Sequence, residues 1–243
     1  GLKNLMDRAI ISRTEKEAKE HVILQNLDTS FQKIDELPFD FERRRMSVIV
    51  KDDSNIVSMV TKGALEEMLT ISTHVEYRGE IIPITEGIRQ EVLAEVGQLN
   101  RQGLRVLGVG YKSGLREDYA YAVTDESDMI LTGYLAFLDP PKPSAAPAIQ
   151  ALLEHGVRTK ILTGDNEKVT QAICEKVGLD VELMLLGADI DQMTDQELAE
   201  AVESVTVFAK LSPDQKARII LQLKKNGHAV GYMGDGINDA PSM

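Results

Sequence analysis

Cysteine is almost absent from this sequence of 243 residues, tryptophan is missing, and aromatic residues make up only 5%. The single cysteine, Cys174, excludes an internal disulfide. Its place in a helical pattern predicts a buried small hydrophobe rather than a reactive thiol. Only four histidines occur, and they share no metal-ligand spacing. These absences exclude a disulfide-stabilised scaffold and a histidine-based metal centre.

Long hydrophobic runs and clusters of basic residues are also lacking. No apolar stretch reaches the roughly 18 residues that a membrane helix needs, and the N-terminus has no signal-peptide layout. The net charge is −12, with 27 Lys and Arg against 39 Asp and Glu, and no basic tract occurs. We therefore expect a chain that is soluble by itself, cytosolic and without a nucleic-acid partner. Its first residues are typical of the interior of a longer protein.

The remaining composition is that of a globular protein, 43% apolar and 27% charged, and the length suits two domains. Residues 1–136 mix helical and strand patterns, and their polar segment 112–128 is expected to be a surface loop. The expected helices cover 2–11, 14–27 and 86–102, and the expected strands cover 31–37, 46–51, 56–61 and 104–111. We predict an α+β domain with an antiparallel sheet and helices.

The pattern changes at a proline-rich hinge, residues 137–143. Beyond it, strands and helices alternate, which is typical of a parallel sheet built from βαβ units. The expected helices cover 144–155, 166–177, 194–203 and 213–226, and the expected strands cover 157–162, 205–208 and 228–233. We predict that 137–143 opens a second domain, of the α/β class, that extends to residue 243.

Three junctions between a strand and a helix in the second half carry groups suited to phosphate. Residues 163–166, Thr-Gly-Asp-Asn, offer a hydroxyl, a close backbone approach and a helix cap. Residues 234–239, Gly-Asp-Gly-Ile-Asn-Asp, place two carboxylates together, which favours a hard cation such as Mg²⁺. Residues 212–216 put Lys216 near a helix start. Taken singly, the first is better explained by a plain capped turn and the third by a solvent-facing lysine.

Together these groups, at successive strand ends of one sheet, would surround a single phosphoryl group. In this the sequence resembles the haloacid dehalogenase-like phosphotransferases and, within them, the P-type ATPases. The matching motifs are TGD at 163–165, the helix lysine 216, GDGIND at 234–239 and DPPK at 139–142. The resemblance implies that the second domain is an incomplete phosphorylation domain of this fold. It implies catalytic roles for Thr163, Lys216, Asn238 and Asp239, with a metal ion held by Asp235 and Asp239.

The first half carries Lys62-Gly63-Ala64, which resembles the KGA signature of the nucleotide-binding domain of P-type pumps. Alone, three residues are a weak signal, and a surface lysine would explain them. The resemblance implies that Phe39 stacks on adenine, that Arg105 reaches the phosphates, and that Asp7 replaces a glutamate that contacts the adenine side. The other residues that it assigns to the nucleotide are Arg43, Gly63, Asp139, Thr163, Gly164, Asp165 and Lys210.

The amino-acid sequence of residues 38–48 and 125–142 is most similar to that of bacterial magnesium-transporting P-type ATPases. A pump for another cation such as Ca²⁺, a soluble phosphatase of the same superfamily, and a regulatory nucleotide-binding module are the alternatives. The family's DKTGT segment, its actuator loop and its membrane helices do not occur in this sequence. We therefore expect the chain to bind ATP or ADP, with Mg²⁺ as cofactor, and to hydrolyse nothing by itself. Its partners would be the actuator and transmembrane domains of the same polypeptide, at the cytoplasmic face of the cell membrane.

Overall fold

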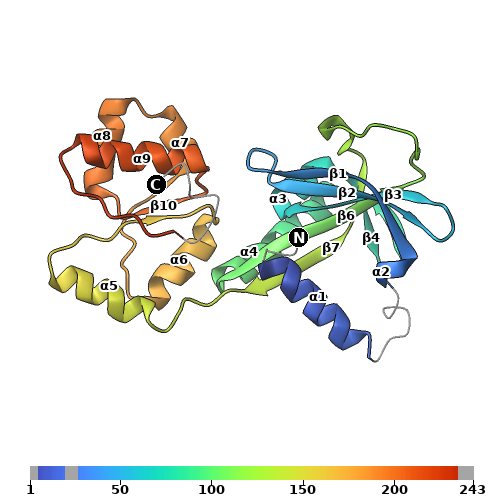
Figure 1. The fold of residues 1–243 in the computed structure, drawn as a ribbon, viewed down its shortest axis with the longest axis horizontal. Coiled ribbons are helices and arrows are strands. Elements are labelled where there is room, and N and C mark those ends of the chain that lie inside the picture. The colour runs from blue at the N-terminus through green and yellow to red at the C-terminus, as the bar shows by residue number, and fades with distance from the viewer. Residues whose placement is uncertain (1–4, 20–26, 235–243) are drawn as a thin grey trace. The chain divides into compact units, whose positions relative to one another are not determined.

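The computed structural model describes residues 5–19 and 27–234, which divide into two compact units (Figure 1). The first unit comprises residues up to 93 together with 106–137, and the second comprises 94–105 together with the residues from 138 on. Each unit contains its own sheet. In the ranges that the structure describes, no helix is long and apolar enough to cross a membrane.

The larger sheet has seven strands in the order β1-β2-β3-β6-β7-β4-β5. These strands are β1 (Phe31–Asp40), β2 (Arg45–Asp52), β3 (Val57–Ala64), β4 (Ser72–Tyr77), β5 (Glu80–Pro83), β6 (Leu104–Ser113) and β7 (Met129–Leu138). The accompanying helices are α1 (Leu5–Glu17), α2 (Leu27–Ser30), α3 (Leu65–Ile71), α4 (Glu86–Arg101) and the short 3₁₀ helix η2 (Val123–Asp125).

The prediction of a purely antiparallel sheet is wrong, because the sheet is mixed. Strands β1, β2, β3 and β6 pair antiparallel in turn, but β4 pairs parallel with β7. No strand was expected over Met129–Leu138, which forms β7. This strand lies between β6 and β4, and the long connection from β4 to β7 allows the two to run in the same direction.

One face of the larger sheet is buried, as the alternation of buried and exposed residues along β3 shows. Val57, Met59, Thr61 and Gly63 are buried, and the residues between them are at least partly exposed. Since successive side chains of a strand point to opposite faces, Lys62 lies on the other face of the sheet. The buried face carries a hydrophobic cluster, which consists of Leu37, Ile49, Val57, Met59 and Met129.

Two further predictions for this region are corrected. Helices were expected over 2–11 and 14–27, but α1 runs without a break across residues 12–13 and ends at Glu17. Residues 20–26 lie outside the described residues, and Leu27 begins the separate helix α2. Segment 112–128 is not simply a polar surface loop. Leu115 and Tyr121 pack against the hydrophobic cluster, and Glu126 is buried. The loop therefore covers part of the core, and its charge is accommodated by partners described below.

The smaller sheet is parallel, as predicted, with the order β8-β10-β9. Its strands are β8 (Ile161–Leu162), β9 (Met184–Leu186) and β10 (Val207–Ala209), and its helices are α5 (Ala145–Glu154), α6 (Glu167–Lys176), α7 (Gly187–Gln192), α8 (Asp195–Ser204) and α9 (Pro213–Lys225). Strand β9 and helix α7 were not predicted. Residues 228–233, expected to form a strand, are irregular because they join no strand ladder within the described residues.

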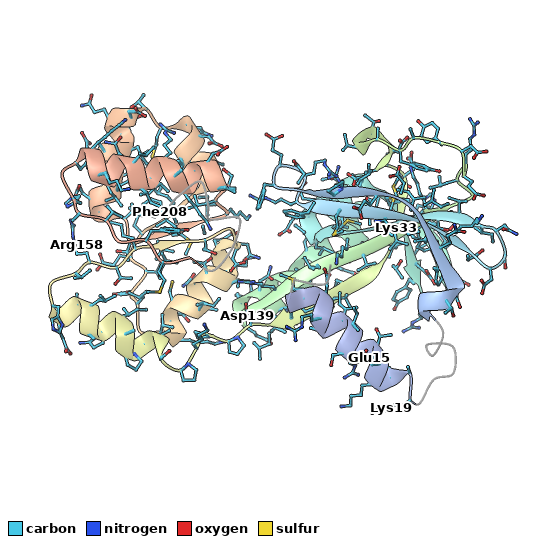
Figure 2. All side chains as sticks on the ribbon, viewed as in Figure 1. Glu15, Lys19, Lys33, Asp139, Arg158 and Phe208 are labelled. Carbon is cyan, nitrogen blue, oxygen red and sulfur yellow. The ribbon has the colours of Figure 1, made fainter. Side chains whose placement is uncertain are left out.

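The core of the second unit surrounds Phe208, which is fully buried in the central strand β10 (Figure 2). Residues of α8 and α9, including Leu198 and Ile219, pack against it. Cys174 is buried as predicted, and its burial raises the pKa of the thiol, so it behaves as a small hydrophobe.

Candidate functional site

Strands β1, β2 and β3 are neighbours, and each has one terminus at the same end of the larger sheet. Asp40 of β1 pairs with Arg45 of β2, and Arg45 pairs with Gly63 of β3. Neighbouring strands are about 4.8 Å apart, so β1 and β3 are separated by roughly 10 Å here. We call this region, residues 39–45 together with 62–64, the turn end. It contains four of the predicted nucleotide residues.

The turn between β1 and β2 is built by Asp40. Its carboxylate accepts hydrogen bonds from the backbone amides of Glu42 (2.9 Å) and Arg43 (2.8 Å). The amide of Arg44 donates to the Asp40 carbonyl oxygen (2.7 Å), and Arg44 has a positive φ of 48°. The hydrogen bond from the Arg43 amide is the main reason that the pKa of Asp40 lies below its ordinary value. The turn is therefore specified locally.

Two aromatic rings are exposed at this turn. Phe39 is 51% exposed and Phe41 is 41% exposed, and their rings pack edge to face with centroids 5.2 Å apart. Phe39 was predicted to bind the nucleotide, whereas Phe41 was not singled out. Large exposed aromatic side chains can stack on a planar base, because every base offers an apolar π face.

Lys62 forms an ion pair with Asp7 of α1. Both side chains are partly buried, with exposures of 29% and 30%. Both residues were predicted to contact the nucleotide, and the structure brings them together on the face of the sheet opposite Thr61. A lysine there can attract a phosphate group, and Asp7 balances its charge in the absence of ligand.

Gly63 allows β3 to approach the turn closely. A Cβ atom at this position would lie 2.5 Å from the Arg45 Cβ and 2.7 Å from the Arg44 carbonyl oxygen. The same carbonyl oxygen accepts a hydrogen bond from the Ala64 amide (3.0 Å). The glycine of the KGA signature is thus required by packing next to the lysine.

Arg43 was predicted to bind the nucleotide, but its guanidinium group points to a buried carboxylate. Its Nη1 donates to Glu126 Oε2 (2.6 Å), and Arg45 Nε donates to the same oxygen (2.8 Å). The other carboxylate oxygen accepts from Ser47 Oγ (2.7 Å), which also lies 2.8 Å from Thr61 Oγ1. The side chain of Glu126 is 0% exposed. Sequence reasoning missed it, because Glu126 is 83 positions from Arg43 and no local pattern links the two residues.

Glu126 stays ionised in the folded chain. Burial alone raises its pKa, but the hydrogen bonds from Arg43, Ser47 and Arg45 outweigh this effect and hold the pKa below its ordinary value of 4.5. The unfolded chain therefore takes up a proton at a higher pH than the folded chain. The stability that this carboxylate contributes is complete above pH 4.5 and is lost as the pH falls through the folded pKa.

This linkage predicts the pH dependence of the first unit. Between about pH 5 and about pH 3, the urea concentration at half-unfolding should fall, and Glu126→Gln should make this dependence shallower. Glu36→Gln is the matched control, because Glu36 is exposed and its ion pair with Lys33 lies at the surface. Circular dichroism in a urea series at each pH measures the effect. An equal slope in the Glu126→Gln variant and the unchanged chain would contradict the assignment.

In the second unit, the TGD motif follows β8 and is hydrogen-bonded to the end of β10. The Thr163 amide donates to the Phe208 carbonyl oxygen (3.0 Å), and the Lys210 amide donates to the Asp165 carbonyl oxygen (2.7 Å). Thr163 Oγ1 accepts from the Asp165 amide (3.1 Å). Lys210 has a positive φ of 53°, and its Nζ lies 3.1 Å from Glu167 Oε2. Thr163, Asp165 and Lys210 are therefore neighbours, whereas the exposed Gly164 is the tip of the loop.

Arg105 and Asp139, which also belong to the second unit, lie beside the TGD motif. Arg105 Nη2 donates to Asp165 Oδ2 (2.7 Å), and its Nη1 lies 3.4 Å from Asp139 Oδ2. The guanidinium group is thus held by two carboxylates. Its Nε–H is buried and has no hydrogen-bond partner within the described residues. A phosphate that approached the terminal nitrogens would compete with these carboxylates.

The predicted helix starts in this unit are confirmed. Asn166 caps α6 and accepts from the Val169 amide (3.0 Å), and Ser212 caps α9 and accepts from the Gln215 amide (3.3 Å). Lys216 follows in the first turns of α9 and is partly buried.

The remaining predicted residues, Asp235, Asn238 and Asp239, lie outside the described residues. Within residues 5–19 and 27–234, no three acidic, histidine or cysteine side chains cluster to hold a metal ion.

Comparison with known proteins places these features in a family. The family model described as "P-type ATPase, cytoplasmic domain N" matches residues 3–144. The chain is 48% identical, over its full length, to a magnesium-transporting ATPase, P-type 1, of Salmonella typhimurium strain LT2, and 47% identical to that of Escherichia coli K12. It is 33% identical over 89% of its length to calcium-transporting ATPase 1 of Bacillus cereus.

The chain spans about a quarter of the length of these relatives: 26% of each magnesium-transporting ATPase and 24% of the calcium-transporting one. The match to the family model nevertheless covers more than half of the chain and includes the whole turn end. The chain therefore belongs to the P-type ATPase family, in the region of its cytoplasmic domain N.

Proposed function

We propose that this chain binds ATP and ADP as the cytosolic part of an ATP-driven cation pump at the cytoplasmic face of a membrane. In this proposal, residues 1–136 form the nucleotide-binding domain. Residues 137–243 form part of a phosphorylation domain of the haloacid dehalogenase-like fold. The observation that carries the proposal is the turn end, where exposed aromatic rings and a partly buried lysine lie about two strand spacings apart.

The turn end offers complementary contacts for an adenine nucleotide. Phe39 would stack on the base, and the positive charge of Lys62 would attract the phosphates or the electron-rich ring face. Asp7 would release Lys62 to the ligand or contact the adenine side. Gly63 would contribute indirectly, because its lack of a side chain lets β3 and the turn come together. Arg43 would act through its hydrogen bonds rather than by touching the ligand.

The second unit would supply groups for the transferred phosphoryl group. Thr163 and Lys216 would bind its oxygens, while Gly164, Asp165 and Lys210 would shape the loop that approaches it. Binding of nucleotide would change the ion pairs that Arg105 forms with Asp139 and Asp165. Asn238 would help to orient these groups around the phosphoryl group. The sequence contains no DKTGT segment, so we do not propose hydrolysis by this chain alone.

Mg²⁺ would offset the negative charge of the phosphates when bound. We assign it to Asp235 and Asp239 on the sequence pattern alone, and no step in the proposal depends on its position.

Magnesium is also the proposed cargo of the complete pump. Relatives that are named magnesium-transporting are 45–48% identical to this chain, compared with 31–35% for ones named calcium-transporting. The remaining parts of the same polypeptide, the actuator and transmembrane domains, would be its partners. A soluble phosphatase is disfavoured because the domain N match spans residues 3–144.

Titration with ADP tests the binding proposal. We expect the backbone NMR signals of Phe39, Lys62 and their neighbours to shift, with a dissociation constant in the millimolar range or below, about −4 kcal/mol or stronger. Inorganic phosphate at the same concentration is the control, and it should shift the signals near Phe39 much less. If ADP at about 10 mM leaves the signals of the turn end unchanged, the proposed site is wrong.

A further inference from the structure

We propose that Glu126 is a positioning residue of the nucleotide site, which holds the turn bearing Phe39 and Phe41 from the opposite face of the sheet. This inference rests on the proposed binding of nucleotide at the turn end. Glu126 itself would touch no ligand. Its effect would pass through Arg43.

Arg43 closes the turn between β1 and β2 with two hydrogen bonds. Its Nη1 donates to Glu126 Oε2 (2.6 Å), and its Nη2 donates to the carbonyl oxygen of Pro38 (2.7 Å). Pro38 directly precedes Phe39, and Arg43 follows shortly after Phe41. One guanidinium group therefore ties both ends of the aromatic segment to a single buried carboxylate.

The carboxylate of Glu126 is held rigidly. The side chain of Glu126 is 0% exposed and accepts charge-assisted hydrogen bonds from two arginines, with a third hydrogen bond from Ser47. Lys112 supports the loop around it, since its Nζ donates to the carbonyl oxygens of Asp125 and Ser127. A buried, fully engaged ion is held in one geometry, because each displacement leaves charge without a partner.

Glu126 lies on the face of the sheet opposite Lys62. Ser47 and Thr61 are directly paired across β2 and β3, so their side chains share a face, and Ser47 contacts Glu126 there. Lys62, the next residue of β3, points to the other face, where Asp7 of α1 contacts it. A nucleotide bound against Lys62 is thus separated from Glu126 by the sheet. Glu126 can influence it only through the turn.

The competing view is that Glu126 merely stabilises the fold. The hydrogen bonds to Glu126 come from two segments, which allows these roles to be separated. We call those from Arg45 and Ser47 of β2 the strand arm and the one from Arg43 the turn arm. Arg43→Gln removes the turn arm and leaves the strand arm in place. Glu126→Gln removes the charge that both arms share while keeping nearly the same shape.

The experiment compares ADP binding and aromatic ring signals in the unchanged chain, Glu126→Gln, Arg43→Gln and the double variant at neutral pH. Calorimetry gives the dissociation constant, and NMR gives the ring-proton signals of Phe39 and Phe41 without ligand. We expect each single change to weaken ADP binding about three- to tenfold, as for the loss of roughly one net hydrogen bond. Both should shift the ring signals. The double variant should be no weaker than the weaker single one, because both changes break the same link.

Val57→Ala is the matched control for stability. Val57 is 4% exposed in the same core, but it lies at the far end of β3 from Gly63. It should lower the urea midpoint while leaving the ADP dissociation constant of the folded chain and the ring signals unchanged. Normal ADP affinity and unchanged ring signals in both Glu126→Gln and Arg43→Gln would overturn this inference alone. Absence of ADP binding by the unchanged chain would overturn the proposed function and this inference with it.

Discussion

Phe39→Ala is expected to weaken the binding of ADP by about 10- to 100-fold while leaving the stability of the first unit almost unchanged. Stacking of a base on an aromatic side chain contributes about 1–3 kcal/mol, and the middle of that range corresponds to this loss of affinity. Phe39 is 51% exposed, so its removal opens no cavity in the hydrophobic core. Calorimetric titration gives the dissociation constant, and urea unfolding gives the stability.

Phe31→Ala is the matched control for this prediction. Phe31 begins the same strand, β1, and is similarly exposed at 47%, but it lies at the opposite end from the turn. Its replacement should leave ADP affinity unchanged. If Phe31→Ala and Phe39→Ala reduce the affinity equally, the effect is not stacking at the turn end. If neither reduces it, Phe39 does not contact the base.

Gly63→Ala is expected to destabilise the first unit by roughly 3 kcal/mol, the upper part of the usual range for overpacking. The added methyl group would meet the Cβ of Arg45 at 2.5 Å and the carbonyl oxygen of Arg44 at 2.7 Å. These are a Cβ atom and a backbone oxygen of the neighbouring strand and turn, so rotation of a side chain cannot relieve the contact. Strands β2 and β3 must separate, which strains the hydrogen bond from the Ala64 amide to Arg44.

Gly87→Ala provides the comparison. Gly87 lies in the first turn of α4, and a Cβ there would meet only the Thr85 hydroxyl, at 3.7 Å. Alanine favours a helix over glycine by up to about 1 kcal/mol, so this change should be neutral or stabilising. Urea denaturation of the two variants measures the difference. An unchanged midpoint for Gly63→Ala would show that the strands are not packed as closely as described.

Features that depend on a few adjacent residues could be read from the sequence. The caps Asn166 and Ser212 start their helices as predicted, because a capping side chain bonds to an amide only a few residues later. The burial of Cys174 followed from helical periodicity. The KGA motif and residues 38–48 pointed to the family, since each is a short contiguous signature, and the match over residues 3–144 agrees.

The strands of the smaller sheet were only partly predictable. Its parallel pairing followed from the alternation of strands and helices, but β9 was missed and 228–233 was predicted as a strand. Short apolar runs become strands only when a neighbour supplies hydrogen bonds, and a run such as Met184–Leu186 does not identify that neighbour.

By itself, the sequence determined the family, the helix caps and the presence of two patterns of secondary structure. The tertiary structure alone decided that the larger sheet is mixed, that Lys62 pairs with Asp7, and that Arg43 turns to a buried Glu126. Arg43 and Glu126 are 83 positions apart, and Lys62 and Asp7 are 55 apart. The choice of partner for a charge depends on which distant segments the fold brings within a few ångströms. Local patterns specify how a segment bends and which side it buries, but they carry no information on what lies against it.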